Sequence, residues 1–239
     1  MLGASTNGYS LTADEIVRKM DDHRLISNNF EMTIRVESYL NNHFENSTMM
    51  KGYVNDGKMT MLNFLEPLNM KGRKVVLKDN DMWLIIPKVK NPIRITASQR
   101  LIGGISYGDV GEVSYAEGYI AKLNGEESIV GMNSDGNKSD PNQCFILELA
   151  AKEMGTKYNK IIIWVDQQNF LPIKADFFAL SGKKMATAYY TAPKEWNGKI
   201  IVTKMFLFDQ INMTKHFSME YSDIKTTQIT DSSNNSQKQ

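Results

Sequence analysis

Few side chains in this sequence have the type and spacing that catalysis or metal binding requires. None of the three histidines, His23, His43 and His216, has a second histidine or a cysteine at ligand spacing, which argues against a zinc site. The single cysteine, Cys144, lies beside the start of an apolar stretch without catalytic-looking neighbours, so we expect a small buried thiol. The chain has no Gly-x-Ser-x-Gly elbow and no phosphate-binding glycine loop. We therefore expect no metal, no cofactor and no enzymatic activity.

Methionine is the only soft metal ligand that is abundant in this sequence. It contains 15 methionines, and the pairs Met49-Met50 and Met59-x-Met61 could suggest copper. Methionine also fills cores and lines surfaces that accept varied apolar partners. Because both pairs fall on expected strands of a methionine-rich chain, we interpret them as packing residues.

Residues 81–119 combine apolar strands with an apolar, glycine-rich connection. An apolar run over residues 82–86 ends at Pro87, and residues 93–97 predict a second strand after a basic connector with Lys88 and Lys90. Five glycines then crowd a segment that still carries aliphatic and tyrosine residues. Because loops are usually polar, we interpret this segment as a mobile flap over an apolar surface. The alternative is an ordinary turn region tucked into the core.

The remaining pattern is that of a β protein with one helix. Thr12 and Glu15 form a capping box, and the apolar spacing that follows predicts a helix over residues 12–23. From residue 30 onward, alternation of apolar and polar residues predicts ten or eleven antiparallel strands joined by short turns. Residues 124–142 are polar and lack periodicity, so we interpret them as a loop.

A sheet of ten or eleven strands is expected to curl or close. We therefore predict a mainly β fold, an open and incomplete antiparallel β-barrel. The N-terminal helix and the lid or flap would cover its hydrophobic cavity.

Several expected strands are apolar on both faces. In the strand over residues 58–65, period-two alternation puts Met59, Met61 and Leu65 on one face and Leu62 and Phe64 on the other. One helix cannot cover a second apolar face, so a bound ligand or partner is expected.

Length and composition limit the function classes. The 239 residues carry 28 basic and 27 acidic side chains, a net charge of +1 that argues against a nucleic-acid partner. Apolar runs of 18 or more residues are absent from the sequence. Residues 1–10 are small and polar, and we expect a flexible leader of a mature protein whose signal peptide has been removed. We expect residues 11–227 to form a single domain and residues 228–239 a disordered tail.

A resemblance to a known family rests on a series of short motifs. The motifs are Phe64-Leu65-Glu66-Pro67, Met70-Lys71-Gly72-Arg73, Asp81-Met82-Trp83-Leu84-Ile85-Ile86-Pro87, Arg94-Ile95-Thr96-Ala97-Ser98-Gln99-Arg100, Leu171-Pro172-Ile173-Lys174 and Ser181-Gly182-Lys183. In their order and spacing the chain resembles the bacterial outer-membrane lipoprotein-sorting family of LolA/LolB-like periplasmic carriers. The resemblance covers about residues 11–227. It departs from the family pattern in the flap, where residues 102–109 lack phenylalanine, and at Ile85, where tyrosine is common.

The resemblance implies a LolA-like carrier domain over residues 11–227, exported to the periplasm and without catalysis. Its ligand would be the acyl chains of a lipoprotein or another lipid, and its candidate partners an inner-membrane transporter or an outer-membrane acceptor. Burial of one methylene contributes about 0.8 kcal/mol, so a single long chain can bind without polar contacts. The alternative is a periplasmic sensor or accessory module that binds a protein segment in its apolar groove. A hydrolase or isomerase on a barrel scaffold is a third hypothesis, but it lacks a catalytic constellation.

Two groups of residues are predicted to form the site. The ligand-contacting side chains in the cavity and flap are Met59, Met61, Trp83, Ile85, Ile105 and Tyr107. Arg94 and Arg100 are expected to anchor the flap or to hold a polar head group. The assignment depends on strand parity, because a shift of one residue moves every side chain of a strand to the other face.

Overall fold

The computed structural model of the chain describes residues 11–24, 27–56, 58–78, 81–96, 98–102, 105–111, 114–153 and 156–227. The expected leader over residues 1–10 and the expected tail over residues 228–239 lie outside these residues. Gly103 and Gly104 of the expected flap also lie outside them.

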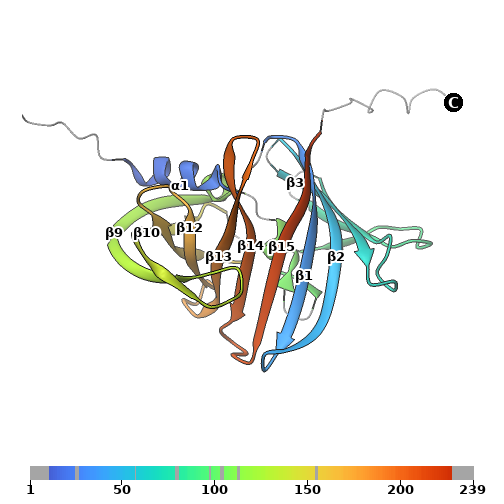
Figure 1. The fold of residues 1–239 in the computed structure, drawn as a ribbon. Helices are drawn as coiled ribbons and strands as arrows, with labels where there is room; N and C mark the ends of the chain where they lie inside the picture. The colour runs from blue at the N-terminus through green and yellow to red at the C-terminus, as the bar shows by residue number, and fades with distance from the viewer. Residues whose placement is uncertain are drawn as a thin grey trace, which may run out of the picture.

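Strands dominate the fold, and in the described part of the chain thirteen of them form one antiparallel sheet that curves around a concave face (Figure 1). Its strands are β1 (Phe30–Leu40), β2 (His43–Asn55), β3 (Lys58–Glu66), β4 (Lys74–Lys78), β5 (Asp81–Ile85), β6 (Ile93–Ile95), β9 (Tyr119–Met132), β10 (Lys138–Ala151), β11 (Lys160–Asp166), β12 (Pro172–Phe178), β13 (Lys184–Trp196), β14 (Lys199–Asp209) and β15 (Lys215–Thr226). A separate two-stranded sheet pairs β7 (Arg100–Ile102) with β8 (Ile105–Ser106). The predicted mainly β, open antiparallel fold is confirmed.

The strand order reveals two meanders joined in the middle of the sheet. The order is β6-β5-β4-β3-β2-β1-β15-β14-β13-β12-β11-β10-β9, so every neighbouring pair except β1 and β15 is consecutive in the chain. The β1–β15 pair extends from Phe30 opposite Thr226 to Leu40 opposite Lys215, with one register shift between Glu31 and Thr33. The two edges of the sheet are therefore β6 and β9.

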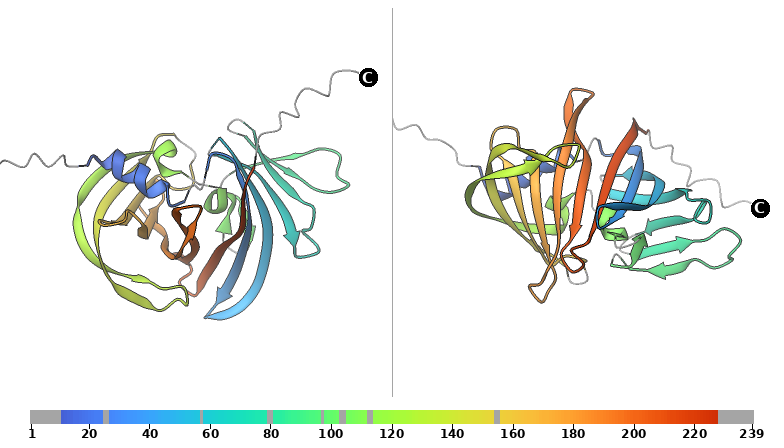
Figure 2. Two further views of the ribbon diagram at one scale, coloured as in Figure 1. Left: turned by 45° about the horizontal axis from the view of Figure 1, so that its top comes forward. Right: turned by 60° about the horizontal axis from the view of Figure 1, so that its bottom comes forward.

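Residues 96–118, here called the crossover segment, connect these two edges. They include β7, β8 and two short helices, α2 (Tyr107–Gly111) and α3 (Tyr115–Gly118). Figure 2 shows these elements within the hollow of the curved sheet. The predicted flap is thus the chain that links the two meanders across the concave face.

The hydrophobic core lies on the concave face of the sheet. Burial alternates along β1, where every second side chain from Phe30 to Ser38 is buried, as period-two geometry requires. Neighbouring strands add large apolar side chains to the same cluster, among them Phe64, Leu147, Ile163, Phe217 and Met219.

The predicted N-terminal helix is present as α1 (Ala13–Asp21). Its N-cap Thr12 accepts a hydrogen bond from the Glu15 backbone amide, and the Glu15 carboxylate accepts one from the Thr12 amide at 2.7 Å. This confirms the capping box. The face with Ile16, Val17 and Met20 is buried, so α1 lies over the concave face as a partial cover.

The interpretation of residues 124–142 as a loop is wrong. They form most of the long β9–β10 hairpin. At its tip, Asn133 Oδ1 accepts hydrogen bonds from the backbone amides of Asp135 and Asn137, at 3.0 Å each. Most β9 side chains from Ile120 to Val130 are exposed or half-buried. An edge strand exposed on both faces has no reason to alternate in polarity, so its sequence carries no strand pattern. The expected ten or eleven strands were accordingly too few.

The expectation that Met59 and Met61 share a face is also wrong. The register between β2 and β3 shifts here, because Val54 pairs with Met59 whereas Tyr53 pairs with Met61. A β-bulge adds one residue and so reverses the alternation. Met59 is buried on the concave face, while Met61 lies on the opposite face.

Gly131→Ala tests how the β9–β10 hairpin is held against β12. A Cβ atom at this position would lie 2.8 Å from Ile173 Cγ2 and 3.0 Å from Ser139 Oγ. We expect overpacking to lower the unfolding free energy by about 1–3 kcal/mol in urea denaturation. Ser128→Ala, at an exposed site on the same strand, is the control and should change stability by less than about 0.5 kcal/mol. Equal stability of the two variants would contradict the close approach.

Candidate functional site: apolar cavities beneath the crossover segment

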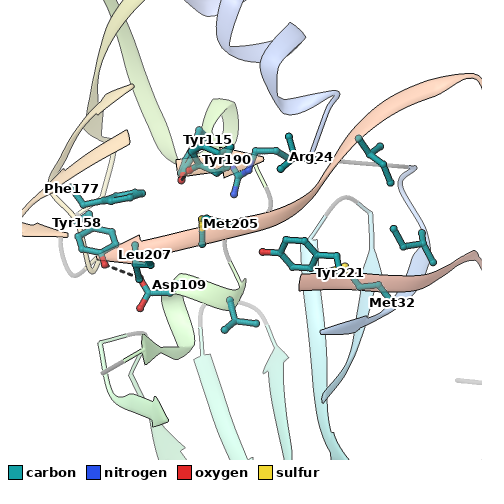
Figure 3. A pocket seen from close by; sticks show the side chains of 14 residues that line it. Arg24, Met32, Asp109, Tyr115, Tyr158, Phe177, Tyr190, Met205, Leu207 and Tyr221 are labelled. Carbon is teal, nitrogen blue, oxygen red and sulfur yellow. Dashed lines mark hydrogen bonds between the residues drawn. The ribbon is translucent and has the colours of Figure 1, made fainter. Parts of the chain in front are cut away.

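A small apolar cavity lies on the concave face between the sheet and the crossover segment (Figure 3). Its walls include Met32 of β1, Phe177 of β12, and Met205 and Leu207 of β14, and Val110 of α2 covers it. Its volume is about 60 Å³. Such a volume holds only a few water molecules.

The end of this cavity that lies under α1 is polar and aromatic. The Arg24 guanidinium carbon lies 4.1 Å from the centre of the Tyr115 ring and 6.0 Å from that of Tyr190. The hydroxyl oxygens of these two tyrosines are 2.9 Å apart. Figure 3 shows both side chains beside Arg24. Burial raises the pKa of Tyr221, which faces the same space, to about 12, so its hydroxyl stays neutral. The cavity is therefore amphipathic, with one cationic end among tyrosine rings.

A buried carboxylate, Asp21, ties α1 to α3. Its Oδ2 accepts hydrogen bonds from Ser114 Oγ and the Ala116 amide, both at 2.8 Å, and its Oδ1 lies 3.6 Å from an Arg24 guanidinium nitrogen. Burial raises the pKa of Asp21, although Arg24 and these hydrogen bonds act in the opposite direction. These contacts hold the N-terminal helix and the end of the crossover segment together.

A second buried carboxylate, Asp109, fixes α2 against the sheet. It forms an ion pair with Lys157, and its Oδ1 accepts a hydrogen bond from Tyr158 Oη at 2.7 Å. Its Oδ2 accepts from the Ser106 amide at 2.8 Å and from Ser106 Oγ at 3.0 Å. Burial, followed by the negative charge of Asp109, raises the pKa of Tyr158 well above its ordinary value, which keeps the hydroxyl a donor. We call these four residues the α2 clip.

A larger cavity of about 370 Å³ adjoins the α2 clip. Ser106, Lys157 and Tyr158 of the clip line it, and Tyr158 and Leu207 line both cavities. Pockets that hold small ligands typically measure about 300–1,000 Å³, so only the larger cavity has that size. Asp109 of the clip lines only the smaller cavity and Ser106 and Lys157 only the larger one, so the clip lies where the two cavities meet.

Three of the predicted ligand-contacting residues are buried near the concave face. Met59 packs beneath Gly52 of β2, and Ile105 and Tyr107 belong to the crossover segment. Burial raises the pKa of Tyr107, an effect that Arg73 opposes. None of the three lines either cavity.

Four of the other five predicted residues, Met61, Trp83, Ile85 and Arg94, lie on the opposite face of β3 to β6. Met61 and Trp83 both pair with Val76, and Trp83 also pairs with Arg94, so they form one row across the sheet. Ile85 follows Trp83 at a spacing of two and shares its face. Arg94 is exposed and forms an ion pair with Asp81. The side chain of Arg100 lies outside the described residues, and ligand contact by this whole set stays a prediction.

Sequence reasoning missed the residues that line the small cavity. Many of them belong to the later strands β12 to β15, among them Phe177, Met205, Leu207 and Tyr221. These strands are visibly apolar in the sequence, but Phe178, Phe206 and Phe208 are apolar on the other face. The pattern therefore did not show which face lines a cavity.

The described residues contain no group of three or more histidine, cysteine, aspartate or glutamate side chains that could hold a metal ion. No helix in that part of the chain is long and apolar enough to cross a membrane. Cys144 is free and buried, as predicted, and burial, followed by Asp166 and Glu127, raises the pKa of its thiol to about 12.

Comparison with known proteins gives a family and a set of related structures. Residues 56–237 match a family model described as "Uncharacterized protein". No curated protein sequence matches the chain. A crystal structure of a LolA superfamily protein from Nitrosomonas europaea is similar to it with a TM-score of 0.83 and 26% identity, over 93% of this chain and 96% of that one.

Two further crystal structures share the fold. A DUF1329 family protein from Desulfovibrio piger has a TM-score of 0.72 and 18% identity, over 90% of this chain and 91% of its own. A putative outer membrane lipoprotein-sorting protein domain from Vibrio parahaemolyticus also has a TM-score of 0.72 and 18% identity, over 92% of this chain and 94% of its own.

Cys144 should react with thiol reagents only after unfolding. Its thiol stays protonated below a pH of about 12 in the folded protein, whereas an unfolded cysteine ionises near its ordinary pKa. We expect Ellman's reagent at about pH 8 to modify the native protein at least about 100-fold more slowly than the urea-unfolded chain. Equal rates in the two states would contradict the burial of the thiol.

Asp109→Asn tests the α2 clip. The amide cannot neutralise Lys157, which is itself mostly buried, so we expect the unfolding free energy to fall by about 3 kcal/mol. Hydrogen exchange over residues 105–111 should accelerate in the same variant. Asp109→Asn/Lys157→Met removes both charges and should recover part of the loss. An Asp109→Asn protein with wild-type stability and exchange would show that the clip does not hold α2.

Proposed function

This chain belongs to the LolA-like family, and from that premise we propose that it is a non-enzymatic carrier of acyl chains in the periplasm. Its ligand is the lipid part of a lipoprotein or another lipid, held against the concave face of the sheet. An inner-membrane transporter or an outer-membrane acceptor would supply or receive the ligand. Export with removal of a signal peptide belongs to the same proposal.

The observation that carries the proposal is an apolar concave face without a second layer of sheet. In the described structure, α1 and the crossover segment are the elements that lie over it, and two cavities remain beneath them. Acyl chains need apolar surface more than polar partners, at about 0.8 kcal/mol for each buried methylene. Methionine at positions 32 and 205 suits a wall that adapts to chains of different shape.

Uptake of a long chain requires the cover to open. The smaller cavity is too small for a ligand of that size, and the α2 clip lies where it meets the larger one. We therefore propose that the structure represents a closed form. Displacement of α2 would join the two cavities into one continuous site.

A second candidate function is an accessory module that binds a protein segment. The observation that favours it is β9, a long edge strand whose outer backbone groups face no further strand of the main sheet. Such an edge can accept an extended peptide as an additional strand. Binding of a peptide with no bound lipid would support this function over the carrier.

Native mass spectrometry of the protein purified from cells, followed by organic extraction, tests the carrier. We expect a bound lipid or acylated species that extraction removes and that added lipid restores. A protein that purifies without such a mass, and takes up no added phospholipid or fatty acid, would contradict the proposal.

Leu207→Trp tests whether the cavities hold the ligand. Leu207 is buried and lines both cavities, so a tryptophan there fills space that the ligand needs. We expect the affinity for a fluorescent fatty acid to fall by about tenfold or more, because overpacking of a filled site costs about 1–3 kcal/mol. Val130→Trp, at an exposed position of β9 that lines neither cavity, is the matched control and should leave binding unchanged. Loss of binding in Trp83→Ala but not in Leu207→Trp would move the site to the opposite face of the sheet.

A further inference from the structure

One end of the sheet carries an unusual set of loops. In an antiparallel meander, alternate connections lie at the same end, and the register of the strands brings five fully described connections together at one end. These connections, here called the loop rim, are residues 41–42, 67–73, 86–92, 179–183 and 210–214. Figure 2 (right) shows the connections after β12 and β14 close together at the lower edge of the molecule.

Four of the five connections of the loop rim, all except residues 41–42, hold an exposed large hydrophobic side chain. These side chains are Leu68, Val89, Leu180, Ile211 and Met213. Leu68 is 86% exposed, Met213 82% and Leu180 78%. The connections over residues 133–137, 167–171 and 197–198, which are also fully described, lie at the opposite end and have no such side chain. Single exposed apolar residues are common on proteins, but their collection at one end is not.

The two ends of the sheet also differ in the charge of their loops. The loop rim contains five basic residues and no acidic one, in a chain whose basic and acidic residues number 28 and 27. The basic residues are Lys71, Arg73, Lys88, Lys90 and Lys183. The three opposite connections contain one charged residue, Asp135. The loop rim thus combines isolated apolar tips with positive charge.

Contacts between the loops make the rim continuous in two places. The Asn41 amide donates a hydrogen bond to the Thr214 carbonyl at 2.8 Å, which joins the first and last connections. A Cβ atom on Gly72 would lie 3.3 Å from Pro87 Cγ, so the connections after β3 and β5 also touch. The apolar tips therefore act in groups rather than singly.

We propose that the loop rim docks this protein on the surface of an anionic lipid bilayer. The apolar tips would enter the interface between head groups and acyl chains, and the lysines would meet lipid phosphates. Charge complementarity favours this partner over a protein, because lysine is depleted from the cores of protein interfaces. The separate tips also differ from the single apolar groove that a peptide helix would need.

The position of the larger cavity agrees with this orientation. Ile211 is an exposed residue of the loop rim and also lines that cavity, together with Asn212 and Lys215. The cavity therefore reaches the end of the sheet that would face the bilayer. Docking itself requires no ligand in the cavity, so it can fail or succeed independently of the carrier function.

Vesicle flotation with the full chain tests the docking surface. We expect binding to phosphatidylcholine vesicles that contain phosphatidylglycerol, weak binding to phosphatidylcholine alone, and a loss of binding at high salt. Lys88→Gln/Lys90→Gln should weaken binding about 25-fold, since each lysine near an anionic surface contributes about fivefold. Leu68→Ser/Leu180→Ser/Met213→Ser should weaken it by about tenfold or more.

Matched variants away from the loop rim serve as controls. Ile200→Ser/Val130→Ser removes exposed apolar residues of β14 and β9, and Lys194→Gln/Lys199→Gln removes exposed lysines beside the turn at residues 197–198. Both controls should bind as the wild type does, and circular dichroism should show that all variants are folded. The proposal is overturned if the wild type does not float with anionic vesicles. It is equally overturned if the rim variants bind like the wild type, or if the controls lose as much binding as they do.

Discussion

The pairing of β1 with β15 is the contact on which the rest of the structure depends. It joins two meanders that otherwise hydrogen bond only within themselves, and it brings together residues almost a chain length apart. Such a distant pairing has a high entropic cost of loop closure. Burial of Ile34 and Val36 beside Met219 offsets it. Because the join lies in the middle of the sheet, the edges fall at β6 and β9, and the chain between them must cross the concave face.

The strand order thus places the crossover segment over the concave face as a cover. The cover is held by the packing of buried apolar side chains such as Ile16, Ile105 and Val110, and by two buried carboxylates. Asp21 joins α1 to α3, and Asp109 joins α2 to Lys157 and Tyr158. A buried charge with several hydrogen bonds is stable while its partners are in place and unfavourable once they separate. A cover held in this way has a closed state that is well defined, and its opening is concentrated at a few residues.

The two cavities lead to different parts of the molecule. The polar, cationic end of the small cavity lies under α1, near Arg24, while the larger cavity reaches the loop rim at Ile211. A carrier on this fold would therefore have the basic, apolar loops at one end of the ligand path and the aromatic cluster of Tyr115 and Tyr190 at the other. The convex face, with Trp83 and Arg94, belongs to neither part of this path.

The sequence by itself determined the fold class, the capping box of α1 and the covering role of the segment after Arg100. Each of these depends on local pattern: period-two alternation, a cap three residues from its partner, and apolar residues in a glycine-rich connection. Tertiary structure alone decided which side chains meet. The bulge between Met59 and Met61 exchanged their faces, and the exposed edge strand β9 had no polarity pattern to read. The cavity and its clips join residues from β1 to β15, and no local pattern records contacts over such distances.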